Sequence, residues 1–156
     1  MDRKGRKWKM FVGQFEHSLD EKNRIVLPAK FRSQLSSTVY ISLDLDSCLS
    51  IYSEATYLKK AEYIASLDDF DQASRSLKRV FFANTYEGSV DKVGRLMIPA
   101  LLLKKAKINK EVSIVGAFDH LQIFSSELLD SSLEKEEKDY EKLASQLRGE
   151  KNHALQ

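Results

Sequence analysis

The sequence predicts an α+β fold with pseudo-twofold symmetry, in which two hairpin units share one core and helices flank them. The first observation is a repeat: residues 11–29 and 82–100 align at a constant offset of 71 residues and are identical at seven of nineteen positions. The second is length, because 156 residues suffice for one core but not for two independent ones. The third is that both halves show the same order of elements: strand, hairpin turn, strand, short helix and two further strands.

The composition is that of a soluble globular protein, with 42% hydrophobic and 31% charged residues. No apolar run approaches the roughly 18 residues that a membrane-spanning helix needs. A secretory signal peptide has an apolar segment after its basic start, and no such segment follows the basic start here. The single cysteine, Cys48, excludes an internal disulfide and is expected in or near the core. We therefore expect a cytoplasmic protein in a reducing compartment.

Positive charge is concentrated at the N-terminus. Five basic residues and one acid, Asp2, give residues 1–9 a net charge of +4. The whole chain has a net charge of +2, so residues 10–156 carry a net charge of −2. Such a tail is typical of a solvated arm, whereas a nucleic-acid arm of this kind adds phosphate contacts without base specificity. Met10 is an alternative natural start, and the sequence leaves these interpretations open.

Each repeat begins with a predicted β-hairpin. Residues 11–18 alternate as in a strand with one buried face. The turn follows at residues 20–23, and at residues 91–94 in the second copy. Aspartate at the start of such a turn accepts hydrogen bonds from the following amides, and Asn23 and Gly94 at its end tolerate a positive φ. Both copies are therefore expected to form the same turn of about three to four residues.

The return strands, residues 24–27 and 95–98, lead into short helices. Pro28 and Pro99 are expected at the first helical position, where a missing amide costs nothing. The helices are expected at residues 29–35 and 100–106. A pair of strands follows each helix, at residues 39–43 and 48–52 in the first half and at residues 111–115 and 120–124 in the second.

Further helices are predicted between and after the two units. Helix starts are favoured at Ser53-Glu54 and at Ser125-Ser126-Glu127, because each offers a hydroxyl N-cap and an acid in the first turn. A connecting helix is expected after Asp68 and Asp69, with an apolar stripe of Phe70, Ala73, Leu77, Val80 and Phe81. The charged C-terminal helix has a similar stripe of Leu129, Leu133, Tyr140, Leu143 and Leu147. We favour packing of this last stripe on its own domain over a subunit contact, and expect residues 149–156 to be frayed.

The centre of each repeat is the pattern Asp-x-x-x-Arg, at Asp20 to Arg24 and at Asp91 to Arg95. In a purely structural interpretation the aspartates cap their turns and the arginines form surface ion pairs, each worth at most about 1 kcal/mol. In a functional interpretation the aspartate shapes the hairpin and the arginine contacts DNA, because its planar fork binds two acceptors of guanine or phosphate at once. The residues alone leave both interpretations open.

The first copy is the better candidate for DNA contacts. In and after its turn it carries Lys22, Asn23, Arg24, Lys30 and Arg32. The second copy has Val93 and Gly94 opposite the first two of these, which leaves Lys92 and Arg95 near its turn.

Other chemistries have little support in the sequence. The three histidines, His17, His120 and His153, fall at no metal-ligand spacing, and the cysteine stands alone. There is no glycine run for phosphate and no Gly-x-Ser-x-Gly motif. We therefore expect no catalytic residues, no metal, no cofactor and no small-molecule substrate.

The duplicated motif resembles the MraZ family of bacterial transcriptional regulators. The similarity rests on two copies of Asp-x-x-x-Arg 71 residues apart, each followed by an apolar triplet and Pro-Ala, with Met10-Phe11-x-Gly13 before the first. It covers the chain from Met10 to about Leu147. The resemblance implies that each half is similar to the swapped-hairpin unit of SpoVT-AbrB-like regulators, and that the two units interleave into one DNA-binding barrel. It also implies a homo-oligomeric ring, associated with the nucleoid, that binds short direct repeats in double-stranded DNA upstream of its own division and cell-wall gene cluster.

The resemblance places the DNA-contacting lysine and arginine of the first motif on Lys22 and Arg24. Asn23 stands where glycine is commoner in the family, and residues 1–9 precede the family's usual start. The expected DNA-binding residues are Lys22, Asn23, Arg24, Lys30 and Arg95, with Asp20 and Asp91 shaping the turns.

The expected organisation is a basic tail at residues 1–9, a first unit at 11–53, connecting helices at 54–81, a second unit at 82–125, and a C-terminal helix and tail at 126–156. The main alternative function is that of a structural ring or protein-interaction module. An antitoxin-like regulator that binds a partner through the charged C-terminal helix is a nearer alternative.

Overall fold

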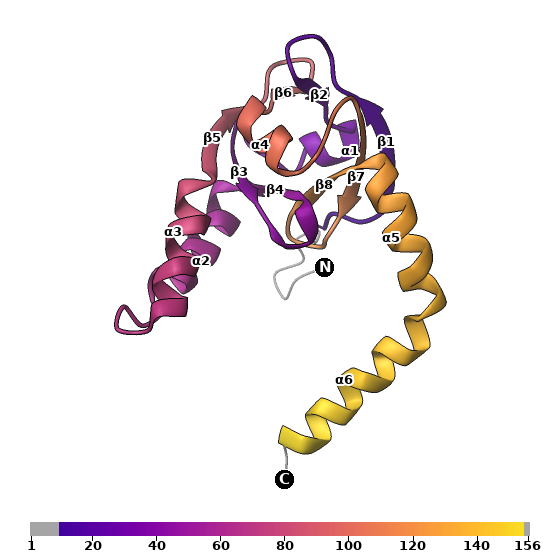
Figure 1. Ribbon diagram of the computed structural model, residues 1–156. Helices are drawn as coiled ribbons and strands as arrows, with labels where there is room; N and C mark the ends of the chain where they lie inside the picture. The colour runs from indigo at the N-terminus through magenta and orange to yellow at the C-terminus, as the bar shows by residue number, and fades with distance from the viewer. Residues whose placement is uncertain (1–9, 155–156) are drawn as a thin grey trace, which may run out of the picture. The chain divides into compact units, whose positions relative to one another are not determined.

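The computed structural model describes residues 10–154 of the chain, and its mixed α+β architecture confirms the predicted class (Figure 1). The elements of the first half are β1 (Gln14–Ser18), β2 (Arg24–Val26), α1 (Ala29–Arg32), β3 (Thr38–Leu43), the 3₁₀ turn η1 (Leu45–Ser47), β4 (Leu49–Ser53) and α2 (Glu54–Ala65). After α3 (Gln72–Ala83), the second half repeats this order with β5 (Thr85–Ser89), β6 (Arg95–Met97), α4 (Ala100–Lys105), β7 (Glu111–Gly116), β8 (Leu121–Ser125) and α5 (Ser126–Lys138), and α6 (Tyr140–Ala154) ends the chain.

The strands pair across the two halves. A six-stranded antiparallel sheet has the order β1-β7-β8-β4-β3-β5, and β2 and β6 form a separate two-stranded antiparallel ribbon. β1 of the first half pairs with β7 of the second, while β5 of the second half pairs with β3 of the first. Each hairpin thus places its first strand beside a strand of the other half. The closed barrel that we expected is not formed by these pairings, because the sheet ends at β1 and β5.

The core follows from the period of two along the strands. Ile25 in β2 and Leu96 in β6 are fully buried and face each other in the ribbon register. Phe31 of α1 is also fully buried and packs edge-on against Phe15, with ring centroids 5.2 Å apart. The buried cluster extends through both halves of the chain, from Phe11 to Ile123. One shared core therefore fixes the ribbon to the sheet.

Three helices differ from the prediction in their ends. Helix α4 ends at Lys105 instead of residue 106. Pro28 and Pro99 were expected at the first helical position but are the N-caps of α1 and α4, because their ψ angles of 138° and 133° are not helical. Helix α1 ends at Arg32 instead of residue 35, because the Ser33 hydroxyl donates to the Lys30 carbonyl at 3.0 Å and competes with the helical hydrogen bonds. Helix α3 starts after Asp71 rather than Asp68, since the Asp71 carboxylate accepts the Ser74 amide at 3.3 Å as an N-cap. The Asp68 carboxylate accepts the Phe70 amide instead and forms a preceding turn.

The C-terminal segment, Ser126–Gln156, is a compact unit of its own. It contains two helices, α5 and α6, rather than the one helix expected. Helix α6 continues to Ala154, so the fraying expected from residue 149 is wrong for the described backbone. The side chains of Tyr140, Leu143 and Leu147 are exposed. Within residues 10–154, no helix is long and apolar enough to cross a membrane.

Candidate nucleic-acid interface

The first turn is shaped by Asp20. One carboxylate oxygen, Oδ1, accepts the backbone amides of Lys22 and Arg24, both at 2.9 Å. The other, Oδ2, accepts the Arg24 Nε at 2.7 Å. The aspartate therefore holds the turn and the arginine side chain together, which is what the structural interpretation of the motif requires.

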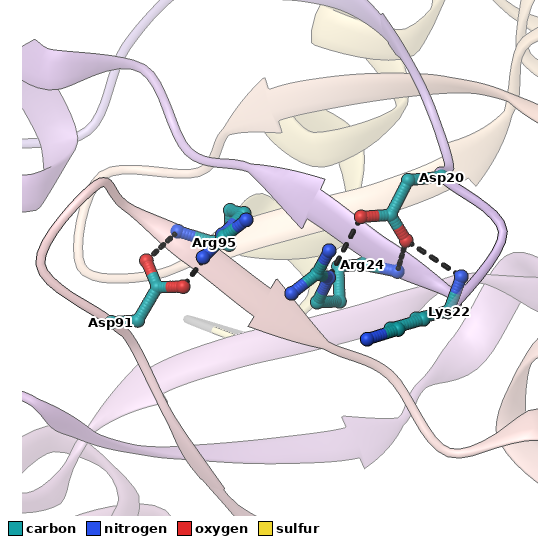
Figure 2. A network of polar contacts seen from close by, with 5 residues as sticks. All are labelled: Asp20, Lys22, Arg24, Asp91 and Arg95. Atoms are coloured by element: carbon teal, nitrogen blue, oxygen red, sulfur yellow. Dashed lines mark hydrogen bonds and ion pairs between the residues drawn. The ribbon is translucent and has the colours of Figure 1, made fainter.

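The second turn repeats this arrangement around Asp91 (Figure 2). Its Oδ1 accepts the amides of Val93 at 3.0 Å and Arg95 at 2.8 Å, and its Oδ2 accepts the Arg95 Nε at 2.7 Å. The last turn residues have positive φ angles, 58° at Asn23 and 86° at Gly94, which confirms the prediction of one turn type in both copies.

The hydrogen bonds keep both turn carboxylates ionised. The Arg24 amide, followed by its side chain, lowers the pKa of Asp20 below its ordinary value of 3.8. The Arg95 amide and side chain lower the pKa of Asp91 in the same way. Each arginine uses Nε for its aspartate and, among the described residues, makes no other side-chain hydrogen bond. The two terminal nitrogens of each guanidinium are therefore available to another acceptor.

The two turns clamp the ribbon from both ends. The Asn23 carbonyl accepts the Ile98 amide at 2.9 Å, and the Gly94 carbonyl accepts the Leu27 amide at 2.9 Å. Each residue with positive φ thus bonds the return strand of the other hairpin. The exchange of hydrogen bonds explains why both copies need the same turn conformation.

The outward face of the ribbon consists of two arginines and two apolar residues. The antiparallel register places Arg24 opposite Met97 and Val26 opposite Arg95, with the buried Ile25–Leu96 pair between them on the other face. The side chains of Arg24 and Arg95 are 27% and 40% exposed. The repeated motif identifies the arginines but not Val26 and Met97, although the alternation of the return strands already places these two residues outward.

The expected site residues do not all lie on this face. Lys22 is exposed in the first turn and Asn23 is half-buried beside it, whereas Lys30 is exposed on α1. The structure thus brings Lys22, Asn23 and Arg24 together in one hairpin. Lys30 extends positive charge beyond the ribbon.

The Arg32 side chain lies against Gly94 in the second hairpin. A Cβ atom built on Gly94 is 2.6 Å from Arg32 Nη1 and 2.7 Å from Nε, and it also overlaps Cδ. A side chain at this position would have to displace the end of the Arg32 side chain, and the φ of 86° favours glycine independently. The sequence gives no local signal of this contact, because the residues are 62 positions apart. The residue equivalent to Arg32 in the second copy is the buried Leu103, so the two turns have different neighbours.

Metal-ligating side chains do not cluster in the part of the chain that the structure describes. Residues 10–154 contain no group of three or more His, Cys, Asp or Glu side chains that could hold a metal ion. Burial raises the pKa of the Cys48 thiol to about 12, so that this thiol stays protonated at neutral pH.

The family model and the individual relatives that match this chain all belong to one family. The family model described as "MraZ protein, putative antitoxin-like" matches residues 10–80 and again residues 81–150. The chain is 38% identical to the transcriptional regulator MraZ of Dictyoglomus thermophilum over 118 residues, which are 76% of this chain and 81% of that protein. It is 36% identical to the one from Halothermothrix orenii over 135 residues, 86% and 94% of the two chains. It is 33% identical to the transcriptional regulator MraZ of Pediococcus pentosaceus over 138 residues, which are 88% of this chain and 96% of that protein.

Proposed function

Because this chain belongs to the MraZ family of transcriptional regulators, we propose that it is a sequence-specific DNA-binding regulator whose contact surface is the β2–β6 ribbon with its two turns. One observation carries the proposal. The guanidinium groups of Arg24 and Arg95 are each held by an aspartate through Nε, and their terminal nitrogens are free to bind acceptors outside the chain.

This arrangement suits the major groove of DNA. A two-stranded ribbon fits the width of the groove, and an arginine fork can bind guanine O6 and N7 together. The Asp20 carboxylate fixes the direction of the Arg24 side chain before DNA arrives, so that less conformational entropy is lost on binding. Lys22 and Asn23 add hydrogen-bonding groups at the same turn, and Lys30 on α1 adds a phosphate contact.

One ribbon offers few contacts, and useful affinity requires several protomers on several DNA sites. The proposal therefore includes a homo-oligomeric ring in which interleaved hairpin units, completing a swapped-hairpin barrel, bind short direct repeats. The repeats are expected upstream of the chain's own division and cell-wall gene cluster, which places the protein in the cytoplasm at the nucleoid. These features rest on the family resemblance of the duplicated motif.

The test is binding of the full chain to the DNA upstream of its own gene. A mobility-shift titration at physiological salt compares this duplex with one in which the repeats are scrambled. We expect the intact duplex to bind at least about a thousandfold more tightly, as specific regulators do. Equal affinity for both duplexes would falsify the proposal and favour a ring that serves as a scaffold.

The C-terminal unit supports a second candidate function. Tyr140, Leu143 and Leu147 expose apolar surface along α6, and a helix of this kind can bind a protein partner in a groove. An antitoxin-like regulator would use this surface for a partner protein. Affinity purification of the full chain and of the Leu143→Asp variant tests this candidate, since a specific partner must be lost from the variant.

A further inference from the structure

We propose that Val26 and Met97 contact the 5-methyl groups of thymine, and that the ribbon thereby selects thymine beside the guanines that its arginines bind. The inference rests on the proposed function and deepens it, because it names the bases that the ribbon distinguishes. It assigns a role to the two outward residues that the charge pattern leaves unexplained.

The four outward residues form a fixed pattern. Strands β2 and β6 have three residues each, and their central residues, Ile25 and Leu96, are fully buried. The outward face therefore holds only Arg24, Val26, Arg95 and Met97. In the register each arginine lies directly opposite an apolar residue, and such opposite residues have Cβ atoms about 5 Å apart.

Val26 and Met97 are both partly exposed to solvent. Val26 is 38% exposed and Met97 is 59% exposed. Single exposed apolar residues are common and need no explanation. Here, however, they make up half of the face that carries both guanidinium groups. A surface that binds only phosphate has no need of them, since phosphate contacts come from cationic and polar groups.

The major groove offers one apolar group that matches this pattern. Thymine presents its 5-methyl group there, whereas guanine presents the acceptors that arginine binds. Bases follow one another at about 3.4 Å along a strand, so an arginine and the residue opposite it reach the same or adjacent base pairs. Met97 adapts its unbranched side chain to a methyl group at slightly different positions. The expected target therefore has thymine next to guanine.

The test removes the methyl group and nothing else. The upstream duplex is prepared once with thymine and once with deoxyuridine throughout, and the dissociation constants are measured by fluorescence anisotropy. For the wild-type chain we expect the deoxyuridine duplex to bind about fourfold more weakly for each methyl contact that is lost. For Met97→Ala we expect weaker binding of the thymine duplex and a smaller ratio between the two duplexes.

A matched control is Val12→Ala, at the end of the first hairpin that is remote from the turn. Val12 is 47% exposed, and its removal should leave the ratio unchanged. The mass of each variant's oligomer is measured beside binding. The inference is overturned if the wild-type chain binds both duplexes equally, or if the ratio is unchanged in both Met97→Ala and Val26→Ala. It is also overturned if these variants change the mass of the oligomer, because Val26 and Met97 would then contact a second copy of the chain instead of DNA.

The proposed function and the inference fail differently. If the wild-type chain binds the thymine duplex no better than scrambled DNA, the proposed function fails and the inference fails with it. If the chain binds its repeats specifically but with equal affinity for thymine and deoxyuridine, only the inference fails.

Discussion

The two hairpins share the same hydrogen bonds around the turn aspartate, which we call the frame. They differ in the turn residues 22–23 and 93–94, which we call the tips. In both, an aspartate binds two backbone amides and an arginine Nε at distances between 2.7 and 3.0 Å. The first tip carries Lys22 and Asn23, whereas the second carries Val93 and Gly94. Gly94 is buried beneath Arg32, which leaves no hydrogen-bonding side chain at that position.

This difference separates two roles of the repeated hairpin, the shaping of the turn and the contact with DNA bases. The hydrogen bonds that shape the turn and clamp the ribbon are needed on both sides, and both sides keep them. Base contacts need free side-chain donors and acceptors, and the first tip offers two at positions where the second has Val93 and Gly94, so that the second turn is left with Lys92. Total charge is a poorer guide, because Arg32 adds its positive charge to the second hairpin. Four predictions test the comparison, from the largest expected effect to the smallest.

Arg24→Ala should have the largest effect on DNA binding. It removes the fork that binds two acceptors, a loss of about 2 kcal/mol for each engaged protomer. Across several protomers the loss multiplies, so that binding to the repeats should fall to the level of scrambled DNA. The mobility shift measures the loss, and the mass of the oligomer should not change. Undiminished binding would remove Arg24 from the interface.

Gly94→Ala should have the largest effect on stability. The new Cβ meets the Arg32 side chain at a φ of 86°, and strain of this kind costs about 1–3 kcal/mol. Thermal unfolding followed by circular dichroism should show a clear drop in the midpoint. The matched change, Asn23→Gly, should alter stability by less than about 0.5 kcal/mol and weaken only DNA binding. Equal destabilisation by both would mean that the tips do not differ as described.

Acid should act equally on the two hairpins. The pKa values of Asp20 and Asp91 are lowered in the folded chain, so their stabilisation is present above the ordinary value of 3.8 and is lost as the pH falls through the lower folded values. Asp20→Asn and Asp91→Asn should therefore each flatten the fall of the unfolding midpoint between about pH 5 and about pH 2. A flattening in only one variant would show that the frames are not equivalent.

Deletion of residues 1–9 should have the smallest effect on specificity. This basic tail lies outside the described residues, and the prediction rests on its charge of +4. The slope of log Kd against log salt should decrease by about one for each phosphate contact that the tail makes. The preferred sequence should stay the same for both chains. A changed preference would mean that the tail contacts bases.

The sequence predicted the local features well. Asp20, Asp91, Asn23 and Gly94 determine their turns through contacts within five residues, so a short pattern is sufficient to identify them. The buried faces of the strands follow in the same way from alternation, as Ile25 shows.

The features that were missed depend on distant or competing contacts. The position of Arg32 over Gly94 depends on how the halves interleave, which no local pattern contains. The start of α3 was misplaced because several nearby aspartates can each serve as an N-cap, and only Asp71 does so. For the candidate site, the arginines were apparent from their motif. The roles of all site residues in DNA binding stay predictions.

The central claim is that equal frames carry unequal contacts, and it is tested most directly by comparing Arg95→Ala with Arg24→Ala. For each variant, the ratio of dissociation constants for scrambled and repeat DNA is measured at one salt concentration by fluorescence anisotropy. We expect Arg24→Ala to reduce this ratio to about one and Arg95→Ala to reduce it only about fivefold, a loss of about 1 kcal/mol. Equal losses in the two variants, or a greater loss in Arg95→Ala, would contradict the claim.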